Sequence, residues 1–161
     1  AEQLSGIFRE NSDLKEAWKL AKAIVAARGP AEIETIDQFK EVTLPMAQRG
    51  KENSFLSRVF QAIRMEVNDE MGALKEMLVQ MPNILADNGR LVVMSYHSLE
   101  DRLVKNLVRS GNIEGKIEKD FYGKPLVPFN AITRKPIVAS EEELARNPRS
   151  RSAKLRIAEK I

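Results

Sequence analysis

The sequence contains no cysteine and one histidine, His97. It can therefore form no disulfide, and it lacks the set of Cys and His ligands that a structural zinc or haem site needs. There is no run of about 18 apolar residues, which excludes a transmembrane helix. The polar opening Ala1-Glu2-Gln3-Leu4 is not that of a signal peptide. We therefore expect a cytoplasmic protein with no metal site and no membrane partner.

The composition is that of an ordinary globular protein, with 161 residues of which 43% are hydrophobic and 30% charged. No internal repeat or low-complexity stretch is visible. The length suits one domain, or one domain with a small appendage. The chain begins at Ala1 instead of Met, within a stretch that reads as a helix, so we expect it to be part of a longer protein.

Positive charge is concentrated towards the end of the sequence. The net charge is only +3, but residues 146–161 include six positive side chains and one negative side chain. Such clustering is typical of a surface that contacts nucleic acid. A solvated basic tail has the same composition, so charge alone leaves both interpretations open.

Residues 1–52 show the pattern of a small helical subdomain. Asp13 with Glu16 is a capping-box pattern that is expected to open a helix, and Gly29-Pro30 would end it. The predicted apolar face of this helix consists of Leu14, Trp18, Ala21 and Val25. We expect Trp18 to lie in the core, since helical spacing explains its position fully.

Further helices follow. Thr35 with Gln38 is a second capping-box pattern, and the short helix after it runs out at Pro45. A polar link then leads to the most periodic stretch of the chain. Its apolar residues recur every three or four positions: Leu56, Val59, Phe60, Ile63, Val67, Met71, Leu74, Leu78 and Met81. This pattern predicts one long helix, or two helices broken near Asn68-Asp69, with one buried stripe.

The run Leu-Val-Val-Met-Ser-Tyr at residues 91–96 is apolar without clear alternation. Strands covered on both faces of a parallel sheet have this pattern, so we predict an internal, mostly parallel strand. Ser98 with Asp101 is a capping-box pattern for the next helix, whose predicted buried face is Leu99, Leu103 and Leu107. The order of helix, buried strand, tight turn and helix indicates an α/β unit.

The last part of the chain contains a second strand. Glycine and proline break residues 111–139 into loops and short extended pieces. Ser140 with Glu143 begins a short acidic helix that Asn147-Pro148 stops. Residues 152–159 alternate between apolar and polar side chains, which predicts a half-exposed strand at or near the edge of the same sheet. The fold class is thus α/β.

His97 and Ser98 form the first candidate site, because they follow the predicted buried strand directly. In open α/β sheets, ligands bind outside the carboxyl ends of the strands, and a helix N-terminus offers free N–H groups to an anion. His97 could hydrogen-bond a base or a phosphate there. The alternative is structural: His97 only holds the turn, and Ser98 caps the helix.

Arg149 and Arg151, within residues 147–152, form the second candidate site. A guanidinium group binds two phosphate oxygens at once, which suits contacts to a nucleic-acid backbone. The alternatives are a solvated loop and ion pairs with the acidic residues 141–143. Asn68-Asp69-Glu70 could supply acid–base chemistry, although a helix-capping turn explains it as well.

Three segments together resemble the RsmH (MraW) family of methyltransferases. They are residues 60–70, 89–102 and 147–156, and their order and relative spacing match the family too. Residues 1–48 are similar to the inserted helical domain of the family, and 111–139 is the least diagnostic part. Two small departures are Asn88, where a second glycine is usual, and Tyr96, where phenylalanine is usual.

The resemblance implies a class I, Rossmann-like enzyme that uses S-adenosylmethionine to methylate N4 of a cytidine in the decoding region of 16S rRNA, on the small ribosomal subunit. Residues 1–52 would be the helical insertion and 53–161 the C-terminal half of the methyltransferase domain. The glycine loop and the acidic residue with which the family holds the cofactor are absent, so we expect cofactor-binding residues upstream of Ala1 and none here. The chain alone is then expected to bind no cofactor, to be inactive and to self-associate through an unpaired strand edge.

Six residues are candidates for the substrate side of the site, from their motif position and chemistry. We expect His97 and Ser98 at the pocket rim, Arg149 and Arg151 on the RNA backbone, and Arg64 and Asn68 as further substrate contacts. The catalytic residues are expected upstream. The alternatives are an RNA-binding α/β module without chemistry of its own and a purely structural fragment.

Overall fold

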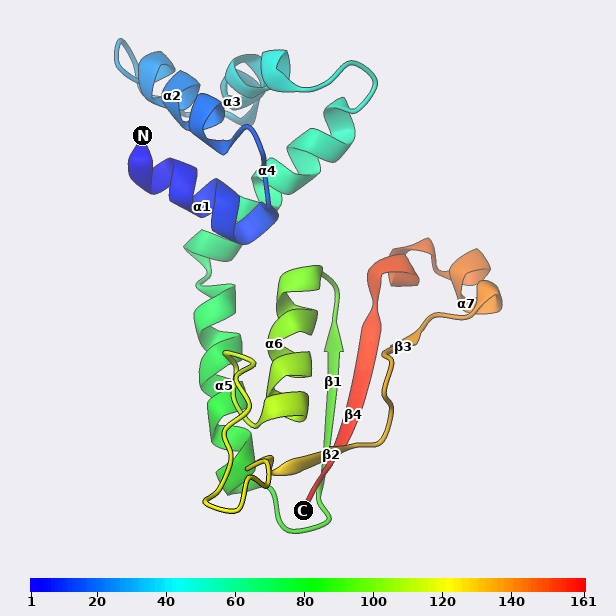
Figure 1. The fold of residues 1–161 in the computed structure, drawn as a ribbon. Helices are drawn as coiled ribbons and strands as arrows, with labels where there is room; N and C mark the ends of the chain where they lie inside the picture. The colour runs from blue at the N-terminus through cyan, green and yellow to red at the C-terminus, as the bar shows by residue number, and fades with distance from the viewer. The chain divides into compact units, whose positions relative to one another are not determined.

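The computed structural model describes residues 1–161, which divide into two compact units, Ala1–Glu70 and Met71–Ile161. The first unit is helical, and the second combines helices with a sheet (Figure 1). The α/β class expected from the sequence is therefore confirmed. None of the helices combines the length and the apolar character that crossing a membrane requires.

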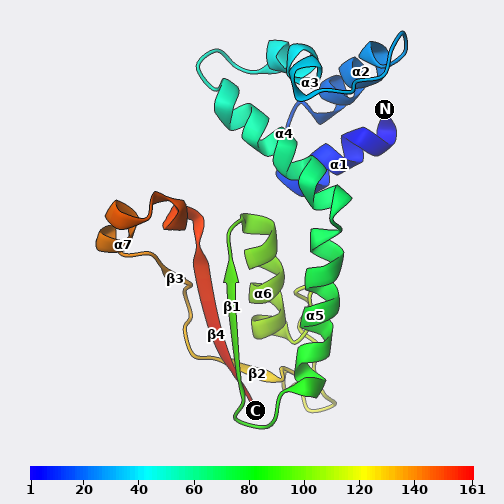
Figure 2. The same cartoon turned by 180° about the vertical axis from the view of Figure 1, so that it is seen from behind.

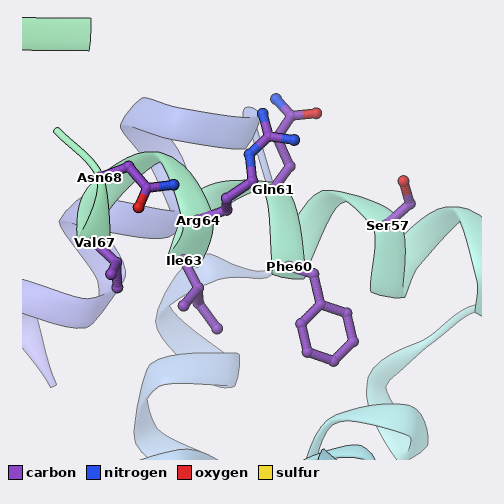
Figure 3. A pocket seen from close by; sticks show the side chains of 7 residues that line it. All are labelled: Ser57, Phe60, Gln61, Ile63, Arg64, Val67 and Asn68. Atoms are coloured by element: carbon purple, nitrogen blue, oxygen red, sulfur yellow. The ribbon is translucent and has the colours of Figure 1, made fainter. Parts of the chain in front are cut away.

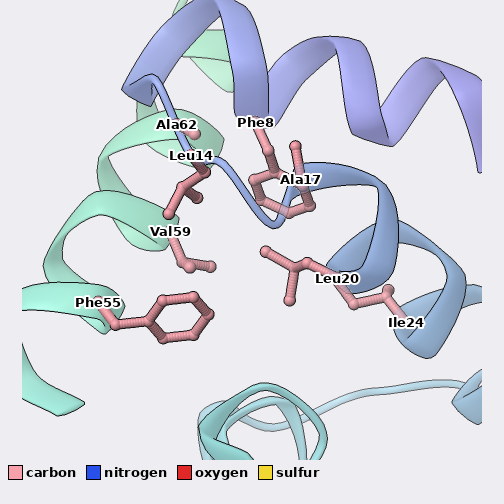
Figure 4. Packing of buried hydrophobic residues seen from close by; sticks show 8 residues of the cluster. All are labelled: Phe8, Leu14, Ala17, Leu20, Ile24, Phe55, Val59 and Ala62. Atoms are coloured by element: carbon pink, nitrogen blue, oxygen red, sulfur yellow. The ribbon is translucent and has the colours of Figure 1, made fainter. Parts of the chain in front are cut away.

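The helical unit has its own hydrophobic core. Its elements are α1 (Glu2–Ser12), α2 (Ala17–Ala27), α3 (Ile36–Thr43), the 3-10 turn η1 (Leu44–Met46) and α4 (Glu52–Val67). Figure 4 shows the buried side chains that meet there: Phe8, Leu14, Ala17, Leu20, Ile24, Phe55, Val59 and Ala62. Since α4 contributes three of them, it packs with the helices before it, whereas the sequence interpretation grouped it with residues 53–161.

The second helix begins later than predicted. Asp13 lies in the left-handed conformation, with φ of 50°, and ends α1 instead of opening α2. Glu16 is the N-cap residue of α2 and makes no side-chain cap. The buried face of the helix is therefore Ala17, Leu20, Ala21 and Ile24. Trp18 is 47% exposed, contrary to prediction, and Lys22 Nζ lies 5.7 Å from the centre of its ring.

Two predictions about the later helices are confirmed. Thr35 Oγ1 accepts the N–H of Gln38, and the Gln38 side chain accepts the N–H of Thr35, so α3 begins with a complete capping box. The long periodic stretch is broken where expected, because Asp69 has a φ of 46°. α4 ends before this residue, and α5 (Glu70–Ile84) begins after it.

The second unit is built around a small antiparallel sheet. After α5 come β1 (Arg90–Ser95), α6 (Ser98–Ser110), β2 (Phe129–Ala131), β3 (Ile137–Val138), α7 (Glu141–Arg146), the 3-10 turn η2 (Pro148–Ser152) and β4 (Lys154–Lys160). β4 pairs antiparallel with β1, β2 and β3. The prediction that 91–96 and 152–159 share a sheet is confirmed.

The parallel direction predicted for β1 and the edge position predicted for β4 were wrong. β1 is antiparallel to its neighbour and lies at an edge of this sheet, and β4 lies in the middle. The alternation of apolar and polar residues in β4 shows that its two faces have different surroundings. It does not determine whether the strand is central or at an edge of the sheet. The apolar run of β1 likewise does not specify the direction of its neighbour.

One face of the sheet is covered and the other is open. In both views α6 lies next to β1, and α5 lies on the other side of α6 (Figures 1 and 2). They form a core with the strands through Leu78, Leu91, Val104, Leu107, Val108, Phe129 and Ala158. On the other face, Val92 and Met94 of β1 are 56% and 54% exposed. The strand predicted to be covered on both faces is thus covered on one within this chain.

Candidate functional site

Two of the predicted motifs meet at one end of the sheet. β1 ends at Ser95, whose register partner is Lys154, the first residue of β4. Residues 96–98 directly after β1 therefore lie next to residues 147–152 directly before β4 (Figure 1). The antiparallel pairing, which the sequence did not reveal, is what brings the two motifs together.

A cavity of about 300 Å³ lies at this end of the sheet and is termed the strand-end cavity. It is lined by Met94, Tyr96, Ile137, Val138, Ala139, Glu143, Asn147, Ser150, Ala153 and Leu155. Leu155 is the register partner of both Met94 and Ile137, so these three side chains form an apolar floor. Polar atoms come from Tyr96 and from the segment around Asn147. The cavity thus offers an apolar surface with a polar rim, as small-molecule binding sites do.

Tyr96, Asn147 and Ser150 were missing from the predicted site, although each belongs to a predicted motif. Ser150 is buried, and its Oγ donates to the carbonyl oxygen of Asn147 at 2.7 Å, which fixes the turn. The spacing of Tyr96 two residues after Met94 could have identified it, because alternate residues of a strand share a face. No sequence signal indicated which face would be hollowed.

His97 is the N-cap residue of α6, and the capping role predicted for Ser98 was wrong by one residue. Nδ1 of His97 accepts the N–H of Glu100 at 3.4 Å, and the Glu100 carboxylate accepts the N–H groups of Tyr96 and His97 at 2.9 and 3.3 Å. The box is therefore His97 with Glu100, not Ser98 with Asp101. Ser98 is the exposed first residue of the helix.

The second ring nitrogen of His97 is not used by the cap. Nε2 lies 3.0 Å from Oε1 of Glu100, but the contact lacks the direction of a hydrogen bond, and Nε2 has no hydrogen-bond partner. Because Nδ1 is the acceptor, the neutral ring carries its proton on Nε2. The cap fixes the ring at the turn between β1 and α6, with one donor uncommitted.

Arg149 and Arg151 are exposed on η2 and form no ion pair. The alternative that they pair with the acidic helix α7 is not observed. Glu143 instead accepts a hydrogen bond from Arg146 Nη2 at 2.7 Å and one from Asn147, and these bonds, with that of Arg146 first, lower its pKa. Both guanidinium groups of η2 are thus available to an external anion.

Asp101 and Arg156 connect α6 to β4 through a buried ion pair that the sequence did not indicate. Arg156 Nε and Nη2 donate to Asp101 Oδ1 and Oδ2 at 2.7 and 3.1 Å, and Lys154 Nζ lies 3.6 Å from Oδ2. Burial raises the pKa of Asp101, but the hydrogen bonds and charges of Arg156 and Lys154 together outweigh it and hold the pKa below its usual range. The ion pair thus holds α6, which follows His97, against β4, which follows the turn with Arg149 and Arg151.

Arg64 and Asn68 lie together at the end of α4, in the helical unit (Figure 3). Arg64 Nε and Nη2 donate to the Glu70 carboxylate at 2.7 and 3.0 Å, and Asn68 Nδ2 donates to it at 3.3 Å. The two residues line an open hollow of about 570 Å³ together with Ser57, Phe60, Gln61, Ile63 and Val67. The guanidinium group of Arg64 is committed to a carboxylate, unlike those of Arg149 and Arg151.

Comparison with known proteins gives a match along the whole chain. Residues 1–161 match the family described as the MraW methylase family. The chain belongs to this family. The resemblance found in the sequence is confirmed, and two of the segments on which it was based, 89–102 and 147–156, meet at the strand-end cavity.

Curated relatives of this MraW family chain are each named "Ribosomal RNA small subunit methyltransferase H". The protein of Parabacteroides distasonis is 55% identical over 161 residues, which cover 100% of this chain and 53% of the relative. That of Phocaeicola vulgatus is 57% identical over 159 residues, covering 99% and 52%, and that of Amoebophilus asiaticus 53% identical over 159 residues, covering 99% and 51%. The chain spans about half the length of these relatives.

Proposed function

We propose that this chain is part of an rRNA methyltransferase that transfers a methyl group from S-adenosylmethionine to N4 of a cytidine in the decoding region of 16S rRNA. The observation that carries the proposal is the family match over all 161 residues, with relatives named for small-subunit rRNA methylation. On this proposal the enzyme works in the cytoplasm, and its partner is the small ribosomal subunit.

The geometry supports a role for this chain on the RNA side of the reaction. Bases that are read by proteins in RNA are splayed out and stacked on aromatic side chains. Tyr96, 56% exposed, borders the strand-end cavity, and Asn147 offers hydrogen bonds at the same rim. Arg149 and Arg151 on the adjoining turn would hold the flanking phosphates. We therefore place a cytidine and its backbone at this end of the sheet, with His97 and Ser98 beside it.

The residues of this chain do not fit the cofactor. A Rossmann-like site binds its cofactor at a glycine-rich turn between a strand and a helix, but the turn after β1 is Tyr96-His97-Ser98. Of the glycines with positive φ, Gly111 follows a helix and none follows a strand. We propose that the cofactor site belongs to the part of the enzyme outside this chain, and that the Rossmann-like sheet continues from the free edge of β1.

The test of the proposed function uses the full-length enzyme. Incubation with S-adenosylmethionine and unmodified small subunits should produce N4-methylcytidine in the decoding region of 16S rRNA, identified by mass spectrometry of nuclease fragments. Methyl groups at another atom or in another region would overturn the proposed substrate. Omission of the cofactor is the control.

A non-catalytic RNA-binding module is the second candidate, and the uncommitted guanidinium groups of Arg149 and Arg151 favour it for the chain taken alone. We expect the isolated chain neither to bind S-adenosylmethionine nor to methylate RNA, because the glycine turn is absent. Calorimetric titration with the cofactor checks this, and saturable binding at one site per chain would contradict it.

We also expect the isolated chain to form a dimer or a swapped assembly. The outer edge of β1 has no partner strand, and exposed Val92 and Met94 lie on the same strand. Such an edge and such apolar surface favour association. Its mass in solution, measured by light scattering, checks the expectation, and a strictly monomeric chain would contradict it.

His97 offers a sharper test of the site. In the full-length enzyme, His97→Ala removes the cap of α6, which should lower the free energy of unfolding by about 1 kcal/mol. The loss of methyl transfer should be larger than this loss of stability explains. The matched control is His97→Asn, which keeps a hydrogen-bond acceptor at the N-cap, with an amide oxygen in place of Nδ1. It should restore stability but not methyl transfer, measured with the same small-subunit substrate. Equal recovery of both would assign His97 a capping role alone.

A further inference from the structure

A second cavity in the α/β unit lies between α6, the residues after β2 and the middle of β4. It has a volume of about 290 Å³ and is termed the basic cavity. Its walls are Lys105, Val108 and Arg109 of α6, Ala131, Thr133 and Arg134 around β2, and Arg156 and Ile157 of β4. It shares no residue with the strand-end cavity and contains none of the residues predicted from the sequence.

The charge of the basic cavity is uncompensated. Four of its residues are cationic, and none is a carboxylate. Arg156 is neutralised by its ion pair with Asp101, but Lys105, Arg109 and Arg134 form no ion pair and are exposed. Three like charges around one cavity repel one another, and an anion between them would relieve this repulsion.

Thr133 provides an independent observation at the same place. Its Oγ1 is buried and has no hydrogen-bond partner, although the residue lines the cavity. Buried hydroxyl groups are almost always hydrogen-bonded, so an orphaned one needs an explanation. A ligand oxygen in the cavity would accept a hydrogen bond from this hydroxyl, and Lys105, Arg109 and Arg134 line the same cavity.

We propose that the basic cavity binds a phosphate group of the RNA backbone. Lys105, Arg109 and Arg134 neutralise its charge, and Thr133 donates a hydrogen bond to one phosphate oxygen. The choice of RNA rests on the proposed function, since a free phosphate compound has the same chemistry. The basic cavity would bind the RNA backbone at a distance from the target base, which lies at the strand-end cavity. It would therefore contribute to the affinity for RNA and not to the methyl-transfer step.

Thr133→Val in the full-length enzyme separates binding from structure. The substitution keeps the shape of the side chain and removes the orphaned hydroxyl, so without ligand the variant should melt at a higher temperature than the wild type. It should nevertheless bind an RNA oligonucleotide of the decoding-region sequence more weakly. If Thr133 had only a structural role, its replacement would not raise the melting temperature and weaken RNA binding at the same time.

The charge is tested with Arg109→Gln/Arg134→Gln. The slope of log affinity for the oligonucleotide against log salt should flatten by about 0.7 to 1, the change expected for one lost phosphate contact. Lys116→Gln/Lys119→Gln, which removes two exposed cations outside the cavity, is the matched control and should leave most of the slope intact. Methyl transfer at saturating RNA should be unchanged while KM rises.

Three outcomes distinguish the possibilities. Weaker RNA binding in both cavity variants and not in the control supports the proposal. Inorganic phosphate is also added to the wild type and to the variants, and the shift in melting temperature is measured. If the cavity variants lose the stabilisation by phosphate but bind RNA unchanged, the cavity binds a free phosphate compound, and the RNA contact is overturned. No change in either assay would overturn the site altogether. Failure of the wild type to methylate 16S rRNA would overturn the proposed function instead, since the binding assays do not depend on it.

Discussion

Asp101→Asn is expected to lower the free energy of unfolding by about 3 kcal/mol, because it leaves a buried guanidinium group without its counter-charge. The side chains of Asp101 and Arg156 are only 13% and 11% exposed, and Nε and Nη2 of the guanidinium both donate to the carboxylate. Urea unfolding measures the loss, and hydrogen exchange of the β4 amides should locate it in the sheet.

The control for this substitution is Asp37→Asn, which breaks the exposed pair with Lys40. Exposed pairs contribute about 0.5 kcal/mol, so this variant should stay close to the wild type. Adding Arg156→Gln to Asp101→Asn should recover part of the lost stability, since it removes the unpaired charge. A loss for Asp101→Asn no larger than that for Asp37→Asn would contradict the structural role of the pair.

The same pair predicts a pH dependence. The pKa of Asp101 is lowered in the folded state, so the unfolded chain binds a proton at higher pH than the folded chain does. The contribution of the pair is therefore complete above the ordinary pKa of aspartate, near 4, and is lost as the pH falls through the lower folded value. Asp101→Asn should show a shallower loss of stability below about pH 4 than the wild type.

Arg149→Ala/Arg151→Ala is expected to weaken RNA binding by the full-length enzyme and to flatten its salt dependence by about 1.5 to 2 in the log–log slope. Both side chains are exposed and form no ion pair, so stability should change by less than about 0.5 kcal/mol. Affinity measured at several salt concentrations, beside thermal melting, separates the two effects.

Arg149→Lys/Arg151→Lys is the informative control for that variant. Lysine keeps the charge but cannot grip two oxygens at once, so the salt slope should persist while affinity falls by an intermediate amount. An alanine variant with unchanged slope and affinity would show that the turn is not an RNA contact, and the basic clustering would then be a solvated surface.

The local signals in the sequence predicted the local structure well. Thr35 with Gln38, and Ser140 with Glu143, lie within one helical turn of each other, and the structure contains both caps. His97 shows the limit of this reasoning. Two overlapping patterns compete there, Ser98 with Asp101 and His97 with Glu100, and only the backbone conformation of the turn decides between them.

The features that depend on distant residues could not be predicted in the same way. Alternation in β4 assigns its side chains to two faces but not its neighbours, and antiparallel pairing with β1 places together motifs that are far apart in the sequence. Asp101 and Arg156 are separated by 55 positions, and each looks like an ordinary surface residue until α6 is laid against β4. The sequence predicted the candidate motifs, whereas the strand-end cavity and the basic cavity could be found only from the fold.

The place of β4 also constrains how the protein is made. β1, β2 and β3 are synthesised before the strand that joins all three, so within this chain they have no partner strand until β4 leaves the ribosome. Contacts between distant segments form slowly, and apolar strands that wait unpaired are prone to aggregate. The sheet of this unit can therefore form only after β4 has been synthesised, whereas the helical unit, complete by residue 70, can fold earlier.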